Sequence, residues 1–302
     1  MAVSTAVAPT ASAARLRAAR LRSAGLTTFL LLPAGLWYLI LLVLPLAIVV
    51  VFSFGLRGKN GGYAPGFVFT NYQRAIDGAT PFVTSLQMAF IGTILCLLAA
   101  LPMAYFIATR GGARKGLFVV LLIIPFWTSF LIRTYAWLTI LGPEGLAGFI
   151  GDRIGDDSFR ILGTQASVLI GVVYGYLPLM IFPIYVTMER MDRTLVEASK
   201  DLGAGRWATF RQITLPITLP GLITGSILVF IPLMGEYVIP AILGYGRVFL
   251  IGNQLVDNFL QARDWPIGSA RAVLLIIIML ISITFYLWYS SRGRRTRDES
   301  LL

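Results

Sequence analysis

The sequence contains no histidine and only one cysteine, Cys96. The lack of histidine excludes imidazole acid–base catalysis, imidazole proton relays and histidine-ligated metal sites. A single cysteine cannot form a disulfide framework or a thiolate cluster within the chain. Because Cys96 lies in the apolar run 94–98, we expect it to be a small buried hydrophobic residue. Neither a metalloenzyme nor a thiol enzyme is therefore expected.

Charged residues are also scarce, since they make up 13% of the 302 residues whereas hydrophobic residues make up 57%. Ordinary globular chains carry roughly a quarter charged residues. The mean hydropathy is +0.80, which is more apolar surface than one soluble core can enclose. The composition therefore predicts an all-α integral membrane protein. The net charge of +11 would suit nucleic acid, but the positions of the basic residues indicate membrane topology instead, so no nucleic-acid partner is expected.

Six apolar stretches are long enough to cross a bilayer, which takes about twenty residues in a helix. Because backbone polar groups must be satisfied internally in lipid, each stretch is predicted to be a helix. The predicted spans are residues 27–54, 82–108, 117–141, 167–188, 219–241 and 269–289.

The basic residues beside these spans predict the orientation of the chain. Sixteen lie in the two tails and in the loops after the second and fourth spans, against seven in the three opposite loops. Since lysine and arginine collect on the cytoplasmic side, both termini are predicted to be cytoplasmic. Residues 27–290 then form the transmembrane domain between tails at 1–26 and 291–302. The composition of the first tail is also compatible with an organellar transit peptide, whereas a cleaved signal peptide fits less well because the first span is too long.

The connection between the fourth and fifth spans, residues 189–216, has the pattern of two short helices separated by glycine. Asp192 is predicted to cap the first helix, and Gly203 to end it in the left-handed conformation. The second helix carries apolar residues on one face, including Trp207, and Pro216 is predicted to stop it. A helical hairpin lying on the lipid headgroups would show the same periodicity.

A longer pattern within this segment distinguishes between these interpretations. Glu197-Ala198-Ser199 is followed by Gly203 and then by Ile213-Thr214-Leu215-Pro216. This spacing resembles the EAA loop of ABC-importer permeases, in which alanine stands at the position of Ser199. The resemblance implies an all-α type I ABC-importer permease fold with six transmembrane helices in the bacterial inner membrane. The residues that match the pattern are Glu197, Ala198, Ser199, Gly203, Ile213, Leu215 and Pro216.

The resemblance also implies that the segment is a coupling loop that docks on a separate ATPase subunit. Glu197 would anchor or orient the coupling helix, and Gly203 would allow close backbone approach at the turn. The permease itself would hold no nucleotide, and the sequence has no Gly-x-x-x-x-Gly-Lys-Ser/Thr loop. We therefore expect a transport subunit without enzymatic activity or cofactor of its own, and ATP and magnesium bound by the partner. The expected partners are a second homologous permease, two ATPase copies, an extracytoplasmic substrate-binding protein and membrane lipid.

Three further stretches, residues 126–137, 235–240 and 263–270, resemble segments of the spermidine/putrescine permeases. The resemblance implies import of polyamines driven by the partner ATPase. An importer of the same class for opines or amino-acid-like solutes is an alternative. A stand-alone secondary transporter is a second alternative, but it gives no reason for the coupling motif. A passive scaffold for the ATPase is a third alternative. An intramembrane enzyme is not expected, because the sequence has no histidine, no paired acids within the spans and no thiolate cluster to act in catalysis.

Arg133 and Glu236 are the charged residues that we expect well inside the spans. An intramembrane charge costs about 2.5–3.5 kcal/mol on insertion scales, so each needs a partner or water. In one interpretation they pair with each other, or extend outward, to fix helix packing. In the other, Glu236 lines the substrate path and meets an ammonium group, while Trp127, Tyr135 and Tyr237 offer aromatic faces to the cation. An unneutralised Arg133 would oppose the second interpretation.

Overall fold

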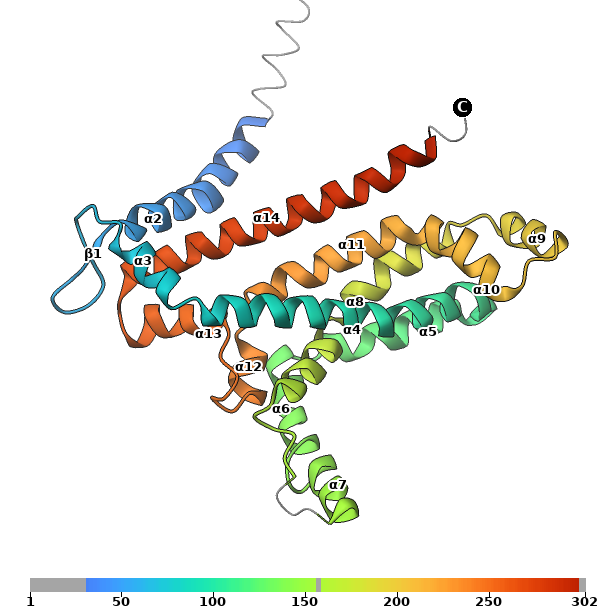
Figure 1. Ribbon diagram of the computed structural model, residues 1–302, viewed down its shortest axis with the longest axis horizontal. Coiled ribbons are helices and arrows are strands. Elements are labelled where there is room, and N and C mark those ends of the chain that lie inside the picture. Colours follow the sequence, from blue (N-terminus) through green and yellow to red (C-terminus); the bar gives the residue numbers. More distant parts are fainter. Residues whose placement is uncertain (1–30, 156–158, 299–302) are drawn as a thin grey trace, which may run out of the picture.

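The computed structural model describes residues 31–155 and 159–298, and its regular elements are almost all helices (Figure 1). The predicted tail 1–26 and the start of the first predicted span lie outside these residues. Within them, five helices are long and apolar enough to cross a membrane, and a sharply bent pair makes a sixth if it is counted as one span. The five are Leu31–Ser53, Thr80–Arg110, Gln165–Glu189, Arg206–Met234 and Trp265–Trp288.

Helices α4 (Thr80–Arg110), α8 (Gln165–Glu189) and α11 (Leu215–Met234) pack against one another as the centre of the bundle. Small residues let their backbones approach closely. A Cβ atom on Gly221 would lie only 2.5 Å from a backbone carbonyl oxygen of α8. Helices in lipid associate through such close packing, because lipid tails are as apolar as the side chains. Cys96 is fully buried in this bundle, which confirms the predicted role of a small hydrophobic residue.

The first span and α14 (Trp265–Asp298) lie beside this central bundle. The first span runs through a π-helical turn, Leu39–Val43, into α2 (Leu44–Ser53), which packs against α14. Its side chains are apolar yet exposed, and Trp37 is 68% exposed. Exposure of so large an apolar surface to water is unfavourable, so this surface suits contact with lipid.

The third predicted span, residues 117–141, is not one continuous helix, and that prediction is wrong. Helix α5 (Lys115–Ile123) and a short 3-10 turn are followed by extended backbone at Thr128, and α6 (Phe130–Ile140) leaves at an angle of 90°. Two local features explain the break. Pro125 has no N–H group to donate, and its carbonyl oxygen accepts the Thr128 hydroxyl at 2.7 Å instead of a helical N–H.

The fifth predicted span, residues 219–241, also differs from the observed helix in where it begins and ends. One helix runs without interruption over Arg206–Met234, and α12 (Val238–Leu243) begins only after a break. Pro216 lies inside the long helix, so the prediction that it stops the helix is wrong. A π-helical turn, Phe210–Thr214, precedes Pro216, and its wider backbone accommodates the proline ring.

The remaining elements gather at the ends of the bundle and in an arm that projects from it (Figure 1). The arm consists of α6 and α7 (Leu146–Ile154). Two short helices, α9 and α10, form one end of the bundle, and a small antiparallel hairpin lies at the other with α3 and α13. Their bounds are Arg193–Asp201 for α9, Arg206–Thr209 for α10, Leu56–Arg57 and Tyr63–Ala64 for β1 and β2, Thr70–Asp77 for α3 and Ile251–Val256 for α13.

Candidate functional site: the coupling loop and a buried carboxylate

The coupling loop, residues 189–216, has the predicted helix before Gly203, α9, and the predicted glycine turn, whereas α10 after the turn continues into the long helix. Asp192 caps α9, because its carboxylate accepts the backbone N–H of Thr194 at 2.9 Å, and this hydrogen bond lowers the pKa of Asp192. Gly203 has a φ of +82°, the left-handed conformation. The two N–H groups at this turn donate to carbonyl oxygens in the last turn of α9, at 2.8 and 3.0 Å. This double closure fixes the point at which the first helix ends.

Ser199 has a partner that the sequence pattern did not reveal. Its hydroxyl lies 2.9 Å from the hydroxyl of Thr209 on α10, and both residues are buried. The hydrogen bond ties the two short helices together. The only signal in the sequence is a pair of hydroxyl residues on either side of the glycine turn, which alone does not predict a contact.

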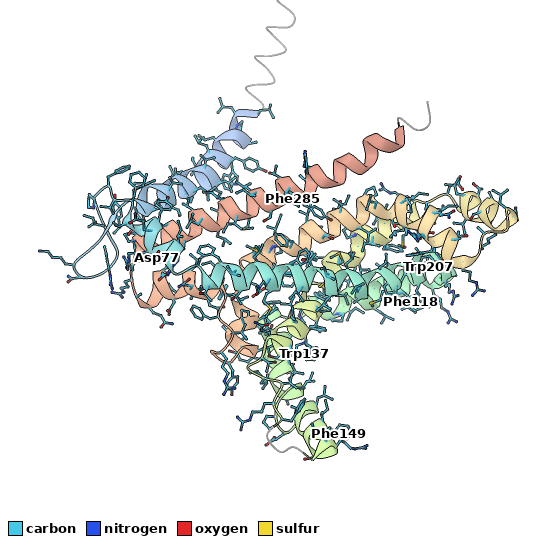
Figure 2. The ribbon with its side chains drawn as sticks, in the orientation of Figure 1. Asp77, Phe118, Trp137, Phe149, Trp207 and Phe285 are labelled. Carbon is cyan, nitrogen blue, oxygen red and sulfur yellow. The ribbon has the colours of Figure 1, made fainter. Side chains whose placement is uncertain are left out.

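The outer surface of the coupling loop is exposed and partly apolar. Leu202 is 89% exposed and Trp207 is 72% exposed, and Figure 2 shows Trp207 at this end of the bundle. Glu197 and Ala198 are also exposed. The other motif residues are half-buried where the helix continues into α11: Ile213, Leu215 and Pro216. Exposed large apolar residues beside an acid, on a segment with fixed turn geometry, suit the docking of another protein.

Glu236 lies at the break between α11 and α12 and is only 6% exposed. Its carboxylate accepts the backbone N–H groups of Val238 at 2.8 Å and Ile239 at 3.2 Å, and the hydroxyl of Tyr176 on α8. The acid therefore stabilises the first turn of α12 and links it to the central bundle. Tyr176 was missed at the level of sequence, because nothing near it in α8 marks it as a partner for an acid.

Arg133 and Glu236 form no ion pair within the described part of the chain. Instead, the guanidinium of Arg133 lies 4.3 Å from the ring centre of Phe126 and 5.9 Å from that of Phe130. Such cation–π contacts partly compensate a desolvated charge. The Nε atom and one terminal nitrogen of Arg133 are buried without a hydrogen-bond partner among the described residues. The three aromatic residues predicted for the path are all exposed: Trp127, Tyr135 and Tyr237.

Among the described residues, two ion pairs form between charged side chains outside the predicted site. Lys115 Nζ, at the start of α5, lies 2.6 and 2.8 Å from the two carboxylate oxygens of Glu189 at the end of α8. At the opposite end of the bundle, Arg74 on α3 lies 3.5 Å from Asp264. Arg271 is buried near the start of α14 and was overlooked as an intramembrane charge, because it is only the third residue of the predicted span.

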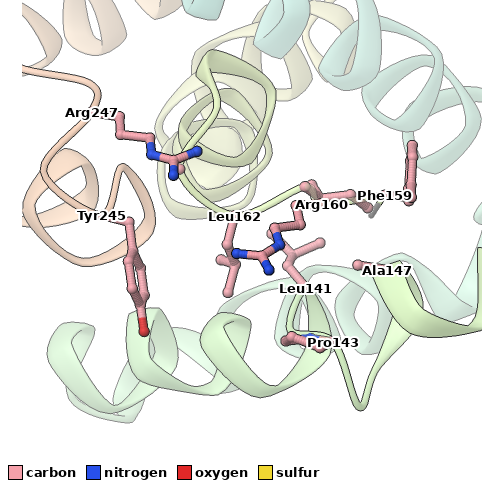
Figure 3. A pocket seen from close by; sticks show the side chains of 10 residues that line it. Leu141, Pro143, Ala147, Phe159, Arg160, Leu162, Tyr245 and Arg247 are labelled. Carbon is pink, nitrogen blue, oxygen red and sulfur yellow. The ribbon is translucent and has the colours of Figure 1, made fainter. Parts of the chain in front are cut away.

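Two hollows in the structure differ in the ligand chemistry that they suit. The cleft in Figure 3, between the base of the arm and the loop after α12, is lined by Arg160, Arg247 and Tyr245. Its described lining contains no acidic residue, so it would repel an organic cation. A larger groove between α4, α11 and α14 has no charged residue in its described lining and is mainly apolar, with Phe230 and Phe285 among its residues, so it suits hydrocarbon rather than a cation. Figure 2 labels Phe285. Neither hollow has an acidic residue in its described lining, whereas the Glu236 carboxylate has the negative charge that attracts a cation.

The long apolar helices and the exposed coupling loop define this chain as a multi-span membrane protein that is built to engage a partner. Residues 92–298 match the family described as the binding-protein-dependent transport system inner membrane component. The chain is 36% identical over 260 residues to the spermidine/putrescine transport system permease protein PotB of Escherichia coli (strain K12), which covers 85% of this chain and 94% of that relative. The PotB protein of Haemophilus influenzae is 36% identical over 254 residues, or 83% of this chain and 89% of the relative. The chain therefore belongs to this family of inner-membrane transport components.

A solved structure has the same fold. A chain in the crystal structure of a bacterial alginate ABC transporter, in complex with an alginate pentasaccharide-bound periplasmic protein, matches with a TM-score of 0.67. The match covers 90% of this chain and 96% of that chain at 19% sequence identity. At this identity the likeness concerns the fold alone.

Proposed function

We propose that this chain is a transmembrane permease subunit of an ATP-driven ABC importer for polyamines such as spermidine and putrescine. Membership of the family supplies the transport role, and the substrate named for the PotB relatives supports the choice of polyamines. One structural observation carries the proposal. A single uninterrupted helix, Arg206–Met234, connects the exposed coupling loop to the break that holds the buried Glu236.

The coupling loop faces the cytoplasm in this proposal, together with both chain termini. Its exposed Leu202 and Trp207 dock on an ATPase subunit, which binds ATP and magnesium in place of this chain. Closure of two ATPase copies moves Glu197 and Gly203 inward and opens the solute cavity to the outside. Hydrolysis of ATP then returns the cavity to the inward-facing state. The subunit moves its solute without breaking a bond.

Glu236 is the group that selects for a cation in this proposal. In the present conformation three hydrogen bonds occupy its carboxylate, and Tyr176 closes one side of it. An ammonium group of the solute replaces the Tyr176 hydroxyl when the cavity opens. Arg133 lies on the ring of Phe126 and forms no ion pair with Glu236 among the described residues, so the carboxylate keeps its charge for the solute. The positive charge of Arg133 is not neutralised either, and it opposes a cation that comes close to it. The exposed aromatic residues offer further contacts to the cation.

A second, similar permease chain completes the translocation path, and an extracytoplasmic binding protein delivers the solute. The arm formed by α6 and α7 supports the first of these partners. It projects from the bundle, and its large apolar residues are exposed, including Ile132 at 68%, Phe149 at 59% and Ile154 at 59% (Figure 2). A surface of this kind requires cover from lipid or protein.

The test uses the whole complex in proteoliposomes, with uptake of labelled spermidine, putrescine, opines and amino acids delivered by the cognate binding protein. Glu236→Gln removes the charge and keeps an oxygen that can accept the two backbone N–H groups. We expect it to weaken the apparent affinity for polyamines about tenfold, which corresponds to about 1.4 kcal/mol. Glu144→Gln removes an exposed acid from the α6–α7 connection and serves as the control, with no expected change.

Each result of this test has a defined meaning. Polyamine uptake with unchanged rate and apparent affinity in Glu236→Gln would refute the role of this acid. ATP-driven uptake of opines or amino acids in place of polyamines would keep the importer and refute the substrate. Uptake that proceeds without ATP would favour a stand-alone transporter instead.

A further inference from the structure

The buried hydrogen bond between Ser199 and Thr209 joins α9 to α10. Among the described side chains of α9, Ser199 is the only buried one, whereas its neighbours Glu197 and Ala198 are exposed. Val196 is half-buried, so α9 contacts the rest of the molecule through Val196 and Ser199, and the Ser199 side chain bonds to Thr209.

Thr209 lies on the helix that enters the membrane. The helix Arg206–Met234 continues from α10 through the π-helical turn into α11, and it ends at the break that Glu236 and Tyr176 hold. Prolines lie within this helix, but no break separates α10 from the end of α11, so continuous helical backbone joins the two ends. A displacement of α10 is thus carried to the Glu236 end of the same helix.

The backbone between α9 and α10 does not by itself hold the two helices in a fixed orientation. It contains Gly203 and Gly205, and a Cβ atom placed on either would meet no neighbour within 4 Å. The two backbone hydrogen bonds at Gly203 fix the end of α9, but Gly205 follows them, and glycine has the largest conformational freedom of any residue. A side-chain tie across the turn is needed if α9 and α10 are to move together.

We infer that Ser199 and Thr209 are positioning residues, and that their hydrogen bond transmits the movement of the docked α9 to the long helix. Alanine, which stands at the position of Ser199 in the pattern that this segment resembles, has no hydroxyl group and could not form this hydrogen bond. The inference rests on the proposed function, because it assigns the step by which ATPase closure reaches the substrate path.

The experiment measures solute imported per ATP hydrolysed by the complete complex in proteoliposomes. Ser199→Ala and Thr209→Val each leave one buried hydroxyl without its partner. We expect each to lower the ratio about fivefold, the factor that corresponds to one lost hydrogen bond. The double variant is expected to lose no more than either single variant, because both remove the same contact. Thr209→Ser keeps the hydroxyl and should stay near the wild-type ratio.

The matched control is Thr109→Val at the same end of the bundle, where the hydroxyl bonds to the Tyr105 carbonyl within its own helix at 2.7 Å. It should leave the ratio unchanged. Retention of the ATPase subunits and the thermal unfolding midpoint are measured for each complex. A variant that keeps both at the wild-type level but has a lower ratio has lost coupling, not assembly or folding.

The outcomes separate this inference from the proposed function. Wild-type complex that imports no solute upon ATP hydrolysis would refute the proposed function. Wild-type complex that couples normally, with both single variants at the wild-type ratio, would overturn only the inference. Losses that multiply in the double variant, or an equal loss in Thr109→Val, would overturn it too, because they would show that the two hydroxyl groups do not act through one contact.

Discussion

Replacement of Gly203 by alanine isolates backbone strain at the turn of the coupling loop. Gly203 has a φ of +82°, and no neighbour lies within 4 Å of the position that a Cβ atom would take. The substitution therefore adds no clash, and its cost is the conformational penalty of an L-residue in the left-handed region, about 1–2 kcal/mol. Gly205 provides the matched control, because its surroundings are equally open but its φ is −68°. Gly205→Ala carries no left-handed penalty and should cost only the preference for glycine over alanine at the N-cap of α10, so its loss should be the smaller of the two.

The assay is solute uptake per ATP hydrolysed by the reconstituted complex, together with the thermal unfolding midpoint. A penalty of 1–2 kcal/mol lowers the population of the native turn by a factor of about 5 to 30. The predicted order of activity at this position is asparagine above alanine above valine, since asparagine tolerates positive φ and β-branched residues do not. Equal losses for Gly203→Ala and Gly205→Ala, or an activity that ignores this order, would refute the argument from backbone conformation.

Three further predictions concern packing, charge and pH. Gly221→Ala places a Cβ atom 2.5 Å from a carbonyl oxygen of α8, and overpacking of this kind costs about 1–3 kcal/mol, so the unfolding midpoint in detergent should fall. Lys115→Glu or Glu189→Lys should each reduce stability by up to about 1 kcal/mol, and the double exchange should restore it; a double variant no better than the singles would count against the ion pair. The N–H of Thr194 lowers the pKa of Asp192, so this cap contributes stability above the ordinary carboxyl pKa of about 4 and loses it as the pH falls through the lower folded value. Hydrogen exchange at Thr194 should lose protection in acid in the wild type but not in Asp192→Asn.

The features that sequence predicted well are those determined by a few neighbouring residues. The Asp192 cap and the left-handed Gly203 follow from local backbone chemistry, and both are present. The apolar spans follow from the length and composition of each stretch, and the described part of the chain contains five continuous helices that are long and apolar enough to cross a membrane. The burial of Cys96 follows from its apolar run in the same way.

The features that sequence missed depend on contacts between distant segments or on competing local forces. The partner of Glu236 is Tyr176, sixty residues away, and no pattern connects them. Pro125 and Pro216 have the same intrinsic effect on a helix, yet the helix breaks after the first and continues through the second. The difference lies in their surroundings: the Thr128 hydroxyl takes the Pro125 carbonyl, whereas a π-helical turn accommodates Pro216.

The measurement that most directly tests the central claim is ATP-dependent uptake of labelled spermidine and putrescine by proteoliposomes that contain the whole complex and its binding protein. A variant with both Glu197 and Gly203 replaced serves as the coupling control. Our account predicts polyamine uptake that requires ATP and is lost in this variant. Uptake that is indifferent to both ATP and the coupling variant would contradict the assignment of this chain as an ATP-driven importer subunit.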